Sequence, residues 1–173
     1  KLNTPRAILL RPHSYDDRIL DALLEDFKGM VIVKPVAAGS SIGVSLVRDH
    51  VGFHDALHNA FEYSPEVLAE EYILGKEATC GVVESSRPGD VYALPPVEIR
   101  NMSAHKDIWG YDAKYSDELH ELVCPGDFSR DERWAIEDAA IRAHKALGLS
   151  HYSRSDFMVT PAGVYILETN TLP

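Results

Sequence analysis

The end of the sequence constrains the fold more than any other stretch, because residues 154–170 have the pattern of two strands joined by a tight turn. The stretches on either side of the turn are rich in β-branched and aromatic side chains, which favour strands. Between them, Pro161-Ala162-Gly163 suits a three-residue hairpin loop that ends in a left-handed glycine. This loop predicts a register in which Thr160 lies opposite Val164.

The predicted register gathers polar side chains on one face of the hairpin. Asp156 lies opposite Glu168, and opposed residues of two paired strands share a face. Arg154 lies opposite Asn170 on the same face. One face is predicted to hold Arg154, Asp156, Met158, Ile166, Glu168 and Asn170, and the other to hold Phe157, Val159, Tyr165 and Leu167.

Two opposed carboxylates on this face indicate a cation between them. Their Cβ atoms would lie roughly 4.5–5.5 Å apart, so the charges would repel unless a counter-charge separated them. Carboxylate and amide oxygens are ligands that Mg²⁺ or Mn²⁺ accepts, together with waters and phosphates. We therefore predict a metal site of Asp156, Glu168 and Asn170, with Arg154 placed beside it for a phosphate. The alternative is an ordinary hairpin with a solvated polar face, in which Arg154 pairs with the acids.

Composition narrows the partners of such a chain. With 173 residues, 45% of them hydrophobic and 25% charged, a folded domain with a sizeable core is expected. A formal net charge of -10 disfavours nucleic acid as a partner. The sequence contains no apolar run long enough to span a membrane and no secretory leader. It also lacks a zinc-like spacing of cysteines. We therefore expect a cytoplasmic protein that binds neither nucleic acid nor membranes.

A second informative stretch is a loop of small residues that follows an apolar strand and Lys34. Residues 36–43 contain alanine, glycine and the hydroxyls of Ser40 and Ser41, so several donors could point at one anion. The stretch is not a P-loop, because no lysine follows its glycines. The alternative is a plain glycine-rich turn.

A third feature is the passage between two predicted strands at residues 67–73 and 78–83. Main-chain donors and acceptors beside apolar walls suit a purine, and Glu70 or Glu77 would suit ribose hydroxyls. Surface acids on a turn are the alternative.

Farther along, residues 100–115 lack periodicity and are predicted to form a lid that carries Lys114. The alternative is a solvated lysine, as a lone lysine usually is.

Amphipathic helices are predicted between these strands. One spans residues 15–28 with Ser14 as its N-cap, and another spans residues 54–63. A third starts at a capping box formed by Ser129 and Glu132 and ends at residue 147.

The ordered set of motifs resembles the ATP-grasp superfamily and, within it, the D-alanine–D-alanine ligases. The segments that carry the resemblance are Val33-Lys34-Pro35 with residues 39–43, residues 70–73 with Gly75 and Glu77, Ala113-Lys114-Tyr115, Cys124-Pro125, Arg154-Ser155-Asp156 and residues 168–171. The resemblance implies an α+β ATP-grasp fold, in which ATP lies between the antiparallel sheets of two subdomains. After a leading segment at residues 1–12, it implies a first subdomain at 13–72 and a second at 73–173.

The resemblance also implies roles for individual residues. It implies that ATP phosphates contact Lys34 and Lys114, that adenine lies against Glu70, Glu71, Tyr72 and Ile73, and that Glu77 binds the ribose. It implies that Asp156, Glu168 and Asn170 hold Mg²⁺ or Mn²⁺. It further implies that Arg154 stabilises an acyl-phosphate made from the first D-alanine, while Ser40, Ser41 and Tyr115 close over the reacting centre.

The activity implied is the ATP-dependent joining of two D-alanines for peptidoglycan precursors, by an enzyme that forms a homodimer. The family's N-terminal substrate domain and its extreme C-terminus have no counterpart here, so this fragment is expected to be inactive alone. Two alternatives remain. One is a related dipeptide or depsipeptide ligase, and the other is a module that binds nucleotide without turnover.

Overall fold

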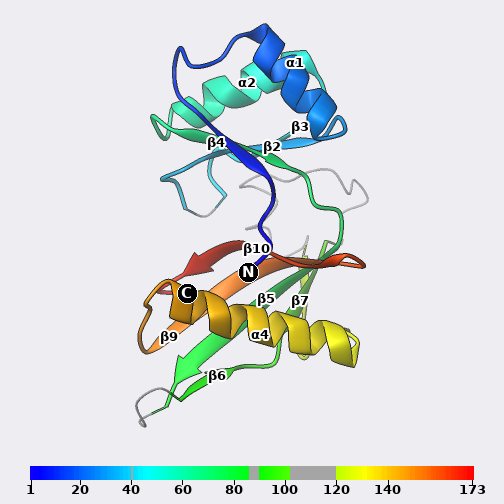
Figure 1. Ribbon diagram of the computed structural model, residues 1–173, viewed down its shortest axis with the longest axis vertical. Helices are drawn as coiled ribbons and strands as arrows, with labels where there is room; N and C mark the ends of the chain where they lie inside the picture. Colours follow the sequence, from blue (N-terminus) through cyan, green and yellow to red (C-terminus); the bar gives the residue numbers. More distant parts are fainter. Residues whose placement is uncertain (40, 86–89, 102–119) are drawn as a thin grey trace. The chain divides into compact units, whose positions relative to one another are not determined.

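The computed structural model describes residues 1–39, 41–85, 90–101 and 120–173 (Figure 1). The described residues divide into two compact units, each with its own core. The first unit comprises residues 6–72, and the second comprises residues 1–5, 73–101 and 120–173. Among the described residues, no helix has both the length and the apolar character that crossing a membrane would require.

The first unit is a four-stranded antiparallel sheet with helices packed on one face (Figure 1). In spatial order the strands are β1 (Ala7–Leu10), β4 (Val67–Glu71), β2 (Val31–Pro35) and β3 (Ser45–Val47). The helices are α1 (Asp17–Asp26) and α2 (His50–Phe61). Leu20 and Leu23 of α1 and the fully buried Phe53 of α2 pack against the sheet, because they recur on one side of each helix.

Both helices of this unit start at aspartates rather than where the sequence pattern placed them. Asp16 is the N-cap of α1 and accepts a hydrogen bond from the Ile19 amide at 3.1 Å, so the prediction of Ser14 as the cap is wrong. The Ser14 hydroxyl instead donates to the Arg11 carbonyl in the preceding turn. In α2, Asp49 accepts from the Gly52 amide, which starts the helix four residues before the predicted position.

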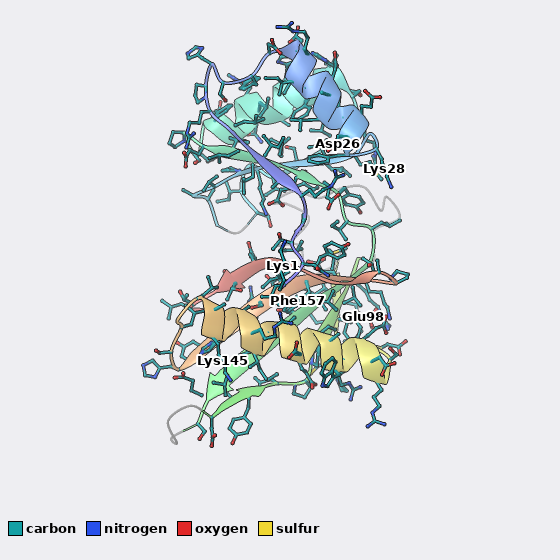
Figure 2. The ribbon with its side chains drawn as sticks, in the orientation of Figure 1. Lys1, Asp26, Lys28, Glu98, Lys145 and Phe157 are labelled. Carbon is teal, nitrogen blue, oxygen red and sulfur yellow. The ribbon has the colours of Figure 1, made fainter. Side chains whose placement is uncertain are left out.

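The second unit is an antiparallel sheet covered on one face by α4 (Arg130–Ala146). Its strands run in the order β10 (Gly163–Asn170), β9 (Tyr152–Thr160), β5 (Lys76–Glu84), β7 (Val97–Asn101) and β8 (His120–Val123), and β6 (Val91–Ala93) also pairs with β5. Phe157, labelled in Figure 2, is fully buried with Ile136 and Ala140 of α4. The predicted capping box of Ser129 and Glu132 is confirmed.

The predicted C-terminal hairpin is present, but its register differs near the turn. Thr160 pairs with Gly163 rather than Val164, and Met158 therefore lies opposite Tyr165. The turn is shorter than predicted because Gly163 adopts a φ of +129° and the Thr160 hydroxyl accepts from the Ala162 amide at 3.0 Å. Consequently the predicted placement of Tyr165 and Ile166 on the two faces is wrong, and Ile166 packs against the core beneath α4.

An irregularity in β10 restores the predicted pairing farther from the turn. The register shifts between Ile166 and Glu168, which leaves Leu167 as the extra residue of a β-bulge. Beyond the bulge, Glu168 lies opposite Asp156, and Asn170 lies opposite Arg154, as predicted. The α+β class with antiparallel sheets is confirmed in both units.

Candidate functional site

The polar face of the second unit lies opposite α4 and centres on Asp156. On β5, Ala78 and Cys80 point into the core, so Glu77 and Thr79 between them point to the other face. Thr79 pairs with Asp156 across the strands, which places the middle of β5 beside the polar part of β9. The face away from α4 therefore gathers Glu77, Thr79, Arg154, Asp156, Glu168 and Asn170.

Asp156 is held in one orientation by two donors. The Thr79 hydroxyl donates to Asp156 Oδ1 at 2.6 Å, and Arg154 Nε donates to the same oxygen at 3.2 Å. The residue is only 8% exposed, so its carboxylate has exchanged most of its hydration for these contacts. Thr79 was not identified from the sequence, because it lies 77 residues from Asp156 along the chain.

Glu168 and Asn170 supply further oxygens to this face. Glu168 is exposed, and Asn170 Nδ2 donates to Glu168 Oε1 at 3.3 Å. This contact uses the amide nitrogen of Asn170 and not its amide oxygen. Two carboxylates and one amide oxygen on adjacent strands form a donor set that fits a hard divalent cation such as Mg²⁺.

Two residues of the first unit that are predicted to bind ATP contact each other. Lys34 on β2 lies with its Nζ 2.8 Å from Glu70 Oε2 on β4, and both side chains are largely buried. The Glu70 carboxylate therefore orients the lysine. The neighbouring Glu71 is held by Arg6, whose backbone amide and Nε donate to its two carboxylate oxygens at 3.0 and 2.8 Å.

The other described residues that are predicted to bind the nucleotide lie on β5 or at the point along the chain where the first unit ends and the second begins. The Tyr72 amide donates to the Met30 carbonyl at 3.3 Å, which holds the last residue of the first unit, and Ile73 begins the second unit. Glu77 lies on β5 between Ile99 and Met158 of the neighbouring strands. Its carboxylate therefore has apolar neighbours on the same face, as a nucleoside site requires.

The small-residue loop after Lys34 is only partly described, since Ser40 lies outside the described residues. Ser41 adopts a left-handed φ of 57°, and Gly43 one of 72°. A side chain at position 43 would lie 2.8 Å from the Pro35 ring and 2.9 Å from the Tyr63 ring, so glycine is required there. The predicted lid residues Lys114 and Tyr115 also lie outside the described residues.

The site offers no reactive thiol on β5. Cys80 lies on the core face, and burial raises the pKa of its thiol to about 12. A thiolate at this position is therefore absent at neutral pH, and the chemistry available to this face comes from carboxylates, hydroxyls and cationic groups.

Solved structures identify this arrangement of sheets and helices. The VanG D-Ala:D-Ser ligase from Enterococcus faecalis matches with a TM-score of 0.80 and 28% identity over 99% of this chain and 48% of that one. The D-alanine–D-alanine ligase from Bacillus anthracis complexed with ATP matches with a TM-score of 0.70 and 28% identity, over 99% of this chain and 49% of that one. The fold is the α+β ATP-grasp fold of such ligases.

Sequence relatives give the family within that fold. The chain belongs to the family described as D-ala D-ala ligase C-terminus, whose model matches residues 4–173. A D-alanine–D-alanine ligase from Geotalea uraniireducens is 39% identical over 149 residues, which make up 86% of this chain and 45% of that protein. The chain thus spans about half the length of the curated relatives that it matches.

Proposed function

We propose that this chain is the ATP-binding part of an ATP-dependent ligase that joins two D-alanines for peptidoglycan precursors. The observation that supports this most is the polar face of the second unit, where Asp156 lies opposite Glu168 in a chain of the D-alanine ligase family. Such a face would suit a divalent cation that accompanies ATP, because carboxylate oxygens are ligands of Mg²⁺.

In this proposal Asp156, Glu168 and Asn170 hold Mg²⁺ or Mn²⁺. The ion supplies positive charge to the phosphate oxygens of ATP during phosphoryl transfer. Thr79 and Arg154 keep Asp156 in its ligand orientation. Asn170 would offer its amide oxygen to the same ion, since its amide nitrogen contacts Glu168.

The cationic side chains act on the nucleotide and on the transferred phosphoryl group. Lys34 contacts the phosphates as a point charge, and Glu70 fixes its position. Arg154 offsets the charge that develops on the phosphoryl oxygens, since a guanidinium can donate two hydrogen bonds to them. The proposal also gives Lys114 a contact with the phosphates, and it has Ser40, Ser41 and Tyr115 close over the reacting centre. Of these four residues, the structure describes only Ser41.

The adenosine is bound by the residues that the resemblance indicates. Glu70, Glu71, Tyr72 and Ile73 line the adenine, and Glu77 accepts hydrogen bonds from the ribose hydroxyls. The position of Glu77 between Ile99 and Met158 supports this role, because a carboxylate with apolar neighbours suits a nucleoside.

The reaction has two steps. The carboxylate of the first D-alanine takes the γ-phosphoryl group of ATP, which gives an acyl-phosphate and ADP. The amine of the second D-alanine then attacks the acyl carbon, phosphate leaves, and the amine loses a proton. The products are D-alanyl-D-alanine, ADP and phosphate, and the complete enzyme is proposed to work in the cytoplasm as a homodimer.

A different second substrate is the strongest competing proposal. It is supported by the structural match to a D-Ala:D-Ser ligase. Three sequence relatives that are 37–39% identical are named D-alanine–D-alanine ligases, and they favour D-alanine. A related depsipeptide ligase or a nucleotide-binding module without turnover would be distinguished by the same assay.

The test is phosphate release by the product of the complete coding sequence with ATP, Mg²⁺ and one amino acid at a time. D-Alanine should stimulate release, L-alanine should not, and D-alanyl-D-alanine should form. Glu168→Gln should abolish release, whereas Asp138→Asn should retain it, because Asp138 pairs with Arg142 on α4. Equal stimulation by an unrelated carboxylate would contradict the proposal, and preferred use of D-serine would favour the competing one.

A further inference from the structure

A second group of potential metal ligands lies in the first unit, on α1 and α2. The ligand atoms of Asp17, His50 and His54 all lie within 4.8 Å of one another. Asp17 is the first residue of α1, and the two histidines belong to α2, which packs beside it (Figure 1). These residues are separate from the polar face of the second unit and have no part in the proposed ligase reaction.

The spacing of the histidines places them for one ion. His50 and His54 are four residues apart on α2, so their side chains lie one above the other on one face of the helix. Two histidines with this spacing are a common zinc-binding pair on a helix. Their side chains are 33% and 47% exposed, so both rings are partly open to solvent.

The distances between the three donor atoms match those around a tetrahedral ion. His50 Nε2 lies 3.1 Å from His54 Nε2, and Asp17 Oδ1 lies 3.2 Å from His54 Nε2 and 3.6 Å from His50 Nε2. Ligands at the usual zinc–nitrogen distance of about 2.0–2.1 Å would be about 3.3 Å apart in a tetrahedron. The three atoms therefore already have the separations that an ion at their centre would set.

Asp21 completes the arrangement as a partner of His50. Its Oδ1 lies 2.7 Å from His50 Nδ1, on the ring nitrogen that faces away from the other ligands. A carboxylate at Nδ1 keeps the proton on that nitrogen and leaves the Nε2 lone pair for a metal. Metal-binding histidines typically have such a partner.

Hydrogen bonds alone satisfy this geometry poorly. With His50 Nδ1–H donating to Asp21, neutral His50 offers only a lone pair at Nε2. His54 Nε2 carries at most one proton, but it lies within hydrogen-bond distance of both that lone pair and the Asp17 carboxylate. When both imidazoles are neutral, one of these two close contacts lacks its own proton, and a cation would satisfy all three groups at once.

We propose that Asp17, His50 and His54 bind a divalent transition-metal ion, with Zn²⁺ as the fitting representative, and that water takes the fourth position. Imidazole nitrogens favour such ions over Mg²⁺, so this site selects differently from the all-oxygen face around Asp156. Because its ligands come from two helices, the bound ion ties the start of α1 to α2 and stabilises the first unit.

The test is calorimetric titration of the untagged protein with ZnCl₂. We expect one saturable site per chain, and Co²⁺ should give the strong visible absorption of four-coordinate cobalt. His54→Ala and Asp17→Asn should each abolish that site, while Asp21→Asn should weaken it about 10- to 100-fold. Zn²⁺ should also raise the thermal unfolding midpoint of the unsubstituted protein but not that of His54→Ala.

Two control variants separate this site from other sources of binding. His58→Ala, one turn farther along α2 with a side chain 87% exposed, should bind Zn²⁺ as the unsubstituted protein does. Asp156→Asn should also retain the site, because it changes only the oxygen-rich face. The proposal is overturned if no saturable Zn²⁺ binding occurs, if folded His54→Ala and Asp17→Asn bind as tightly as the unsubstituted protein, or if His58→Ala removes the site.

Discussion

Asp156 illustrates how a single side chain of the proposed metal site is held in one orientation. Its carboxylate accepts from Thr79 at 2.6 Å and from Arg154 at 3.2 Å, so its rotamer is fixed before any ion arrives. A ligand held in this way loses little conformational freedom on binding, and partners of ligands commonly affect metal affinity for that reason. Thr79 is therefore a positioning residue in the proposed site.

We predict that Thr79→Val lowers the affinity for Mg²⁺-ATP about 10- to 100-fold with little change in fold. Valine has nearly the shape of threonine but cannot donate to Asp156, so the carboxylate keeps only its contact with Arg154. Calorimetric titration of ATP in the presence of Mg²⁺ measures the change. Thr169→Val is the matched control, because the Thr169 hydroxyl contacts Ser155 at 2.8 Å rather than Asp156, and an equal loss in both variants would contradict the positioning role.

At this scale the sequence predicted the residues of the proposed metal site but not the side chains that hold them in place. Alternation along one hairpin, a local property, predicted that Asp156 faces Glu168, and the two residues do lie opposite each other because a bulge offsets the shorter turn. Thr79 reaches Asp156 only because β5 pairs with β9, and the sequence alone does not identify that distant pairing. The contact between Lys34 and Glu70 was missed for the same reason, since it depends on the pairing of β2 with β4.

At the scale of elements, the hairpin combines a short turn with a bulge. The three-residue loop inferred from Pro161-Ala162-Gly163 would have placed Ile166 on the polar face. With the observed two-residue turn, Ile166 instead packs into the core under α4. The bulge at Leu167 then returns Glu168 to the face of Asp156. Apolar stripes predicted the cores of the helices well, but helix starts depended on which of several neighbouring polar residues formed the cap.

A second element, the start of β7, is predicted to make the fold sensitive to acid. Glu98, labelled in Figure 2, is buried, and a hydrogen bond from Arg100 together with one from the Asp127 amide holds the pKa of its carboxyl below 4.5. A carboxyl whose pKa is lowered on folding stabilises the fold above its unfolded pKa, and this contribution is lost as pH falls through the folded pKa.

We therefore predict that Glu98→Gln lowers the thermal unfolding midpoint at neutral pH, and that its difference from the unsubstituted protein shrinks below about pH 4.5. Unfolding followed by circular dichroism from about pH 7 to about pH 3 measures both effects. Glu121→Gln is the control, because that exposed carboxylate lies 3.7 Å from Arg100, and its substitution should have a much smaller effect. A difference for Glu98→Gln that stays constant with pH would contradict the assignment.

At the scale of the whole molecule, the chain consists of two units with separate hydrophobic cores. Each unit carries part of the proposed nucleotide machinery, with Lys34 in the first and Asp156 in the second. The relatives are about twice as long as this chain, so the proposed ligase reaction draws on more than these 173 residues. Both the fold class and the family were accessible from the sequence, because its motifs form an ordered set that extends along nearly the whole chain.

We predict that the 173-residue chain binds ATP with Mg²⁺ but forms no D-alanyl-D-alanine, whereas the product of the complete coding sequence does. Positioning two reactants can contribute about 7–11 kcal/mol to lowering a barrier, and the lengths of the relatives indicate that part of this positioning lies outside the chain. Chromatographic detection of the dipeptide compares the two proteins at equal concentration. Dipeptide formation by the 173-residue chain alone would show that these residues suffice to position both D-alanines.

The most direct test of the central claim is calorimetric titration of ATP into the unsubstituted protein, Asp156→Ala and Glu168→Ala, each with and without Mg²⁺. We predict that only the unsubstituted protein binds ATP, that it does so only with Mg²⁺, and that all three give the same folded circular dichroism spectrum. The reason is that both carboxylates lie on the face of the second unit away from α4, where they contribute to ligand binding rather than to the core. Unchanged Mg²⁺-dependent ATP affinity in the two folded variants would contradict the account, and loss of the folded spectrum would show that the acids instead hold the hairpin together.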